Sequence, residues 1–595
     1  MAKGCRNIIA AAFIAAVAAC AKPGSPSGGP RDTTPPEVLK TLPANRTTGF
    51  TGKSLTITFD EFVVLDKIND KFMISPPVTK RPEIVLKGKN LVITIDETLR
   101  DSTTYTLYFQ DAIRDLNESN VLENYQFVFS TGSYIDSLSL AGTVADAFSL
   151  EVPERMLVML HSNLSDSAPL KIIPDYISMT DQTGYFSVSN LRAGRYRLFA
   201  LKDDNSNRKY EAGDEQFAFA GEIIEITAEN NSPILEEEHD HEEDTTHSHV
   251  HRREPDVSLY SFLSARTRHY LVTSSRRQAR LLEYVFSVPS DTPNFVFNAA
   301  GVGPEGYFTE ASRGFDTIRI WLKDSTIYNQ PTIETVITFP FTDVNDSLVL
   351  RTDTVPMRFI QPRAPRGGAR ERPISLQSNA NRAGIPPGRD IKIVPDVPLL
   401  SVDFPDFSLT RANDTTGTQL AFSHFFDPLV PREIIIRHSL QEGSDYRLEI
   451  PPGALKSIYG ETNDSASFSF GVRTAASYGT LTIRLSGYEG AVVLQLLNSG
   501  EKVIMEEQVD SPGKTEFRFI DNGKYRIKVI YDTDGNGAWT PGNFVTGRQP
   551  ESVSFFPEEL DIKSNWDMEQ DWEIGEKNKK AENLRLKKPP QIITR

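Results

Sequence analysis

Two loops of this sequence carry oxygen-bearing side chains at alternating positions, a spacing that suits calcium. Counting from the first aspartate of each loop, positions 1, 3, 5 and 12 of the first loop hold Asp203, Asn205, Asn207 and Asp214. The same positions of the second loop hold Asp532, Asp534, Asn536 and Asn543. Calcium loops turn alternate side-chain oxygens towards one ion. The spacing therefore predicts a calcium site in each loop, of weak affinity because the ligands carry little charge.

Both loops also depart from the pattern of an EF-hand. The first has Arg208 at position 6, where the second has the usual glycine, Gly537. Neither loop ends in a bidentate glutamate, and strands rather than helices are expected on both sides. A long hairpin turn, whose Asp and Asn side chains bond to their own backbone, produces the same spacing. The sequence leaves both interpretations open.

A second group of metal-binding side chains lies in an acidic stretch. It consists of His239, His241, His247, His249 and His251. Alternating histidines among carboxylates can chelate zinc or copper. The stretch lacks the HExxH pattern of a zinc protease, because Asp244 and Thr245 follow where the second histidine is needed. The alternative is a solvated low-complexity linker that holds no metal in a defined geometry.

The start of the chain indicates export and lipidation. Lys3 and Arg6 precede an apolar run that ends in Val17-Ala18-Ala19-Cys20, the pattern of a lipobox. This predicts a signal peptide over 1–19, acylation of Cys20 and a membrane as partner through the lipid anchor. The other cysteine, Cys5, would leave with the signal, so the mature chain would have no disulfide. We expect an outer-membrane protein, and the sequence leaves open whether its body faces the periplasm or the cell surface.

Strand periodicity dominates the rest of the chain. Segments such as 54–59, 90–95 and 104–109 alternate apolar and polar residues, which is typical of half-buried strands. The chain has 37 Gly and 38 Pro, as many short strands and turns require. The expected fold class is all-β, with several β-sandwiches in series. The formal charge of −16 argues against nucleic acid as a partner.

The chain also repeats itself at long range. The segment 194–203 (GRYRLFALKD) aligns with 523–532 (GKYRIKVIYD), and each leads into one of the two Asp/Asn loops. A fainter repeat relates 105–129 to 446–470. Such self-similarity indicates an array in which two kinds of unit each occur twice.

The first unit resembles a known domain family. Residues 32–38 (DTTPPEV), 55–59 (LTITF) and 127–131 (FVFST) are similar to the bacterial Ig-like domain of SbsA-type S-layer proteins. The whole chain resembles lipoproteins of Bacteroidota that carry this domain after a Gly-Gly-Pro-Arg-Asp segment, here 28–32. The second unit is similar to carboxypeptidase-regulatory-like or transthyretin-like sandwiches. The resemblance implies an envelope protein without established catalytic residues.

These observations divide the chain into ten expected segments. They are a signal peptide (1–19), a lipidated spacer (20–33), an Ig-like domain (34–133), a transthyretin-like sandwich (137–229), an acidic His-rich linker (230–256), a β domain (257–358), an Arg/Pro/Gly-rich linker (359–394), a degenerate Ig-like domain (395–475), a second transthyretin-like sandwich (478–574) and a basic tail (575–595).

The function predicted for this array is structural, adhesive or binding, in a membrane-anchored envelope lipoprotein. No catalytic residue is predicted and no cofactor is required; Ca²⁺ is a candidate ligand of the two Asp/Asn loops. An envelope protein or glycan is the expected partner. Two alternatives stay open: an enzyme or enzyme-accessory protein acting on envelope glycans, whose carboxylate pair would leave no local signature, and a weak calcium-binding protein.

Overall fold

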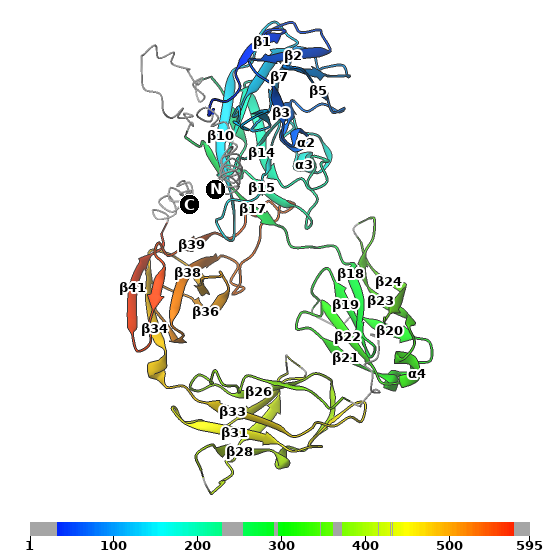
Figure 1. Ribbon diagram of the computed structural model, residues 1–595, viewed down its shortest axis with the longest axis vertical. Coiled ribbons are helices and arrows are strands. Elements are labelled where there is room, and N and C mark those ends of the chain that lie inside the picture. The colour runs from blue at the N-terminus through cyan, green and yellow to red at the C-terminus, as the bar shows by residue number, and fades with distance from the viewer. Residues whose placement is uncertain are drawn as a thin grey trace, which may run out of the picture.

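The computed structural model describes residues 32–228, 254–290, 295–345, 347–360, 372–414, 416–428, 430 and 432–575. It confirms the all-β fold class. We define five modules by strand pairing: module 1 (32–134), module 2 (135–264), module 3 (268–360), module 4 (372–474) and module 5 (478–575). Modules 2 to 5 follow one another around a closed ring, with module 5 returning to module 2, and module 1 extends from module 2 outside the ring (Figure 1). No helix within the described residues is long and apolar enough to cross a membrane.

Module 1 is a sandwich of two sheets, β1-β2-β6-β5 and β4-β7-β9, with the pair β3-β8 at its side. In β2, Leu55, Ile57 and Phe59 are buried, while the residues between them point outwards. This alternation places the apolar side chains of both sheets in one core. The elements are β1 (Val38–Leu42), β2 (Ser54–Phe59), β3 (Val63–Leu65), α2 (Ile68–Lys71), β4 (Met73–Ser75), β5 (Glu83–Lys87), β6 (Asn90–Thr94), β7 (Thr104–Tyr108), β8 (Ile113–Asp115) and β9 (Gln126–Ser130).

Module 2 has one eight-stranded sheet, in the order β12-β11-β14-β15-β17-β10-β13, with β16 also paired to β14. Its β17 is parallel to β10 and antiparallel to β15. The elements are β10 (Leu138–Asp146), β11 (Leu157–His161), α3 (Ala168–Lys171), β12 (Tyr176–Met179), β13 (Tyr185–Leu191), β14 (Gly194–Leu201), β15 (Gln216–Phe219), β16 (Ile224–Ile226) and β17 (Val257–Leu263).

The pairing of β17 corrects an expected boundary. We expected residue 257 to open a separate β domain, whereas β17 completes module 2. The acidic His-rich segment therefore lies between two strands of one module, and not between modules. Its five histidines fall outside the described residues. The boundary was missed because a parallel pair joined across a long insertion leaves no local sequence signal.

Module 5 repeats the topology of module 2. Its sheets are β36-β35-β38-β39, with β40 on β38, and β37-β34-β41, in which β34 and β41 are parallel as β10 and β17 are. The loop between β40 and β41 is short, which identifies the segment between β16 and β17 as an insertion in module 2. The strands are β34 (Gly479–Ser486), β35 (Ala491–Asn498), β36 (Val503–Val509), β37 (Gly513–Ile520), β38 (Gly523–Asp532), β39 (Val553–Phe555), β40 (Leu560–Ile562) and β41 (Asp567–Glu573).

Module 4 repeats the topology of module 1, with sheets β25-β26-β30-β29 and β28-β31-β33 and the pair β27-β32. Its core includes Ile374, Ile385 and Ile391, which lie in the linker expected over 359–394. That linker is therefore shorter than expected, since a few spaced isoleucines suffice to start a strand in a polar stretch. The strands are β25 (Leu376–Ser378), β26 (Ile391–Pro395), β27 (Leu399–Val402), β28 (Ser408–Arg411), β29 (Ser423–Phe426), β30 (Ile434–Arg437), β31 (Asp445–Ile450), β32 (Leu455–Ser457) and β33 (Ala466–Gly471).

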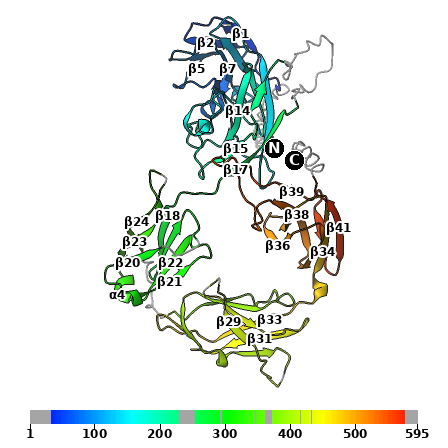
Figure 2. The same cartoon turned by 180° about the vertical axis from the view of Figure 1, so that it is seen from behind.

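Module 3 pairs two sheets, β18-β19-β22-β21 and β20-β23-β24, around a core of its own. Modules 3 and 4 complete the ring between module 2 and module 5, as the view from behind also shows (Figure 2). The elements of module 3 are β18 (Leu271–Gln278), β19 (Leu281–Phe286), β20 (Val296–Ala299), β21 (Tyr307–Ala311), β22 (Thr317–Leu322), α4 (Ser325–Tyr328), β23 (Thr332–Thr342) and β24 (Leu348–Arg358).

Candidate cation-binding loops at the contact between modules 2 and 5

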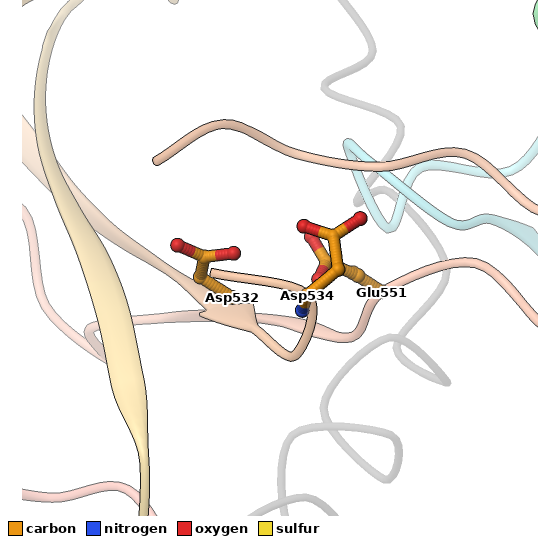
Figure 3. A group of neighbouring side chains, drawn as sticks. All are labelled: Asp532, Asp534 and Glu551. Carbon is orange, nitrogen blue, oxygen red and sulfur yellow. The ribbon is translucent and has the colours of Figure 1, made fainter. Parts of the chain in front are cut away.

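The loop that follows β38 in module 5 is organised around Asp532. Its two carboxylate oxygens accept hydrogen bonds from the backbone N–H groups of Asn536 and Gly537, at 3.1 and 2.9 Å. Gly535 and Gly537 have φ values of +71° and +74°, which side chains with a Cβ rarely adopt, so these glycines permit the tight turn. The turn places Asp534 next to Asp532 on the same side of the loop (Figure 3).

A third carboxylate, that of Glu551, completes this cluster, and the loop spacing did not predict it. Glu551 accepts hydrogen bonds from the backbone N–H groups of Thr533 at 2.6 Å and Thr540 at 2.9 Å. Oxygen atoms of Asp532, Asp534 and Glu551 all lie within 4.8 Å of one another (Figure 3). Calcium ligands stand about 2.3–2.6 Å from the ion, so oxygens on opposite sides of it are about 5 Å apart. The three carboxylates are therefore close enough to share one ion.

Burial makes this cluster electrostatically costly without a counter-charge. Asp532 and Glu551 are 4% and 5% exposed. Their partners within the described part of the chain are N–H and hydroxyl groups, with no ion pair to a basic side chain. Negatively charged carboxylates this close together repel one another. A hard divalent cation with oxygen ligands, such as Ca²⁺, would relieve this repulsion.

The loop that follows β14 in module 2 has the same construction. Asp203 accepts hydrogen bonds from the backbone N–H groups of Asn207 and Arg208, each at 3.0 Å. Glu215 occupies the place of Glu551: its Oε2 accepts a hydrogen bond from the backbone N–H of Glu211 at 3.0 Å. Burial raises the pKa of Asp203 above its usual range. The two loops thus share an aspartate at the strand end and a glutamate that returns to the loop.

One side-chain oxygen of Glu215 has no hydrogen-bond partner. Its side chain is 3% exposed, and its Oε1 has no hydrogen-bond partner. Burial raises the pKa of Glu215 to about 7, and the negative charge of Asp203 also contributes. An orphaned carboxylate oxygen in the interior costs free energy. A cation bound beside Asp203 would supply the missing partner.

The structure places the remaining predicted residues as follows. Asn205 and Asn207 accept backbone N–H bonds within the first loop, and Asn536 does so in the second. Asp214 instead forms an ion pair with Arg266 at 3.4 Å. Asn543 lies in a separate turn, where its Oδ1 accepts a hydrogen bond from the N–H of Thr546. Cys20 and the five histidines lie outside the described residues.

Glu215 and Glu551, rather than Asp214 and Asn543, thus supply the carboxylate at the end of each loop. Counting to position 12 missed them because both glutamates lie beyond that position, just before the strand that follows each loop. One available signal was the internal repeat, in which a glutamate precedes β15 in module 2 and β39 in module 5.

The module 5 loop also carries the main anchor of the contact with module 2. Phe544 is 4% exposed and inserts among three phenylalanine rings of module 2. Its ring centroid lies 5.2–5.6 Å from theirs, at angles of 70–89°, which are favoured edge-to-face pairs. The rings belong to Phe199, Phe217 and Phe219.

Further contacts surround this anchor. Trp539 packs on Phe148 of module 2 with ring centroids 5.0 Å apart. Gly542 lies so close to the Phe262 ring that an added Cβ would stand 2.5 Å from it. The side-chain amide of Gln549 donates a hydrogen bond to the carbonyl of a module 2 strand residue at 3.0 Å. A cleft of about 520 Å³ lies beside this contact, with both modules contributing to its walls.

Comparisons with known proteins bear mainly on module 1. A model of the bacterial Ig-like domain family matches residues 32–131, which confirms the Ig-like part of the resemblance. A search of curated proteins returned no match.

Solved structures give distant matches only. The N-terminal part of the bacterial S-layer protein SbsC is 15% identical over 31% of this chain and 40% of its own, with a TM-score of 0.12. A longer SbsC structure is 10% identical over 89% of this chain and 67% of its own, with a TM-score of 0.14. The T6 backbone pilin of Streptococcus pyogenes is 8% identical over 74% of this chain and 98% of its own, with a TM-score of 0.13.

This chain thus spans less than half of the first of these structures, and all three scores are too low to carry an argument about function. What the comparisons establish is that residues 32–131 form a bacterial Ig-like domain in an all-β chain.

Proposed function

We propose that this protein is a non-catalytic structural or binding protein of the bacterial cell envelope, whose sandwiches are held in a closed ring. The insertion of Phe544 of module 5 into module 2 carries this proposal. Sandwiches joined only by linkers would move independently. A ring closed by an apolar anchor fixes the relative orientation of its modules, which suits a scaffold that presents surfaces to an envelope protein or glycan.

The proposed envelope location depends on Cys20. Acyl chains on this residue would tether the ring through the short spacer before Asp32, the first described residue. The Ig-like match of residues 32–131 supports an extracytoplasmic setting. We propose the outer membrane, facing either the periplasm or the outside.

Metabolic labelling with an alkyne fatty acid tests this anchor in a bacterial host. We expect the wild-type chain and a Cys5→Ala control to be labelled and to sediment with membranes. Cys20→Ala should be unlabelled and absent from the membrane fraction. Labelled, membrane-bound Cys20→Ala would refute the anchor. Protease treatment of intact cells then distinguishes surface display, in which the ring is cleaved, from the periplasmic orientation, in which it is protected.

Calcium binding is the second candidate function, and the Asp532–Asp534–Glu551 cluster favours it. Calcium sites of extracellular modules have dissociation constants of about 10⁻⁴–10⁻³ M, and we expect the same range here. Calorimetric titration of CaCl₂ into the full chain tests this. Asp534→Asn should weaken the binding, while Asp561→Asn, an exposed carboxylate on β40 of the same module, should leave it unchanged. Absence of binding heat at millimolar Ca²⁺ would refute this function.

A further inference from the structure

We propose that calcium locks the ring shut, because the loops that would hold the ions also form the contact between modules 2 and 5. This inference rests on the calcium binding proposed above. It adds a consequence: removal of calcium opens the ring at this one contact.

The same position of each loop carries an aromatic anchor of the contact. Tyr210 is at position 8 of the module 2 loop, and Trp539 is at position 8 of the module 5 loop. Tyr210 is 3% exposed and stacks on Phe217 at 3.9 Å, which is one of the rings that receive Phe544. Both sides of the contact are therefore built on a candidate cation loop.

Hydrogen bonds connect the proposed ligand residues to the contact between modules 2 and 5. The indole N–H of Trp539 donates a hydrogen bond to the backbone carbonyl of Glu551 at 2.9 Å. Gln549, two residues before Glu551, donates its hydrogen bond to the carbonyl of Phe219 in module 2. On the other side, the hydroxyl of Tyr210 bonds with that of Ser264 at 2.8 Å, and Ser264 donates to the carbonyl of Gly542 at 3.2 Å. An ion that fixes Glu551 therefore also fixes residues that bridge the two modules.

Two independent features indicate that the loops need a cation. In module 5, three carboxylates share a space of 4.8 Å, with two of them almost fully buried. In module 2, Glu215 is 3% exposed; its Oε2 accepts a hydrogen bond from the loop N–H of Glu211, and its Oε1 has no hydrogen-bond partner. Without a cation, repulsion and desolvation favour outward movement of these carboxylates. That movement displaces the segment between Asp532 and Glu551, which contains Trp539, Gly542 and Phe544.

Fluorescence energy transfer between two dyes tests whether calcium binding closes the contact between modules 2 and 5. The full-length chain with Cys5→Ser and Cys20→Ser has no cysteine left. Glu222→Cys and Ser552→Cys then place one label on each wall of the cleft between modules 2 and 5. We expect high transfer in millimolar CaCl₂, a fall on adding a chelator, and recovery on adding excess CaCl₂. MgCl₂ at the same concentration should restore less, since Mg²⁺ demands a tighter octahedral site.

Two matched variants and small-angle scattering distinguish a failure of the coupling from a failure of calcium binding. Asp534→Asn should move the calcium midpoint of the transfer at least tenfold higher, and Asp561→Asn should not move it. Small-angle scattering of the unlabelled wild-type chain should show a larger radius of gyration in chelator. Binding heat with unchanged transfer and radius in chelator would overturn the coupling and leave calcium binding intact. Absence of binding heat would overturn both proposals.

Discussion

Replacing Phe544 with alanine tests whether the contact between modules 2 and 5 holds the ring closed. The ring of Phe544 is almost fully buried, 5.2–5.6 Å from three phenylalanine rings of module 2. Truncating a buried phenylalanine to alanine costs about 3–5 kcal/mol, including the cavity left behind. Since about 1.4 kcal/mol is a tenfold change, the ratio of closed to open rings should fall roughly 10²- to 4 × 10³-fold.

Small-angle scattering of the full chain measures this change. We expect the radius of gyration of Phe544→Ala to exceed that of the wild type, because modules 3 and 4 would remain attached while the contact opens. Val545→Ala is the matched control, since its side chain is 74% exposed beside the anchor. Melting of modules 2 and 5 should be little changed, because each also has a core to which Phe544 does not belong. A Phe544→Ala chain with the wild-type radius, with the modules still folded, would show that the anchor does not close the ring.

Three further predictions concern Lys528, Gly542 and the core of module 1. Burial lowers the pKa of Lys528 to about 7. The unfolded chain therefore binds more protons between pH 7 and 10, and stability should rise with pH there by about 3 kcal/mol. Lys528→Met should abolish that rise, and equal pH dependence of the two melting temperatures would contradict it. Gly542→Val should open the ring as Phe544→Ala does, because its Cβ would overlap the Phe262 ring at 2.5 Å; an unchanged radius of gyration would count against this. Ile57→Ala should destabilise module 1 by about 2–5 kcal/mol, because Ile57 is 0% exposed. It should lower the calorimetric transition in which module 1 unfolds, and module 2 should follow in part because Met73 and Tyr108 pack against it. The calcium titration should be unaltered, and an unchanged module 1 transition would contradict the prediction.

Much of the fold was predictable because its determinants are local. Alternation over 54–59 predicted a strand with three buried apolar residues, and β2 has that burial pattern. A period of two is a property of the backbone, so it can be recognised without knowing the strand's partners. The repeat of 194–203 at 523–532 likewise predicted that β14 and β38 are equivalent strands in two modules of the same topology.

The candidate sites were predictable only in part. Asp203 and Asp532 are found at the strand ends where the loops begin, because turn chemistry acts over a few residues. Glu215 and Glu551 could not be found by loop spacing, since their approach depends on how β15 and β39 return beside β14 and β38. The parallel pairing of β17 with β10 also depends on contacts between distant segments.

The sequence by itself determined the all-β character, the repeated modules and the aspartates that open both loops. The strand character and the aspartates follow from residue types at short separation, where backbone geometry sets the period. The repeat follows from the direct match between segments 194–203 and 523–532. Only the tertiary structure decided that the two loops face one another across a contact, with Phe544 of one module among the aromatic rings of the other. That contact joins segments more than three hundred residues apart, and no local pattern records it, because it depends on how modules 2 to 5 are oriented around the ring (Figure 1).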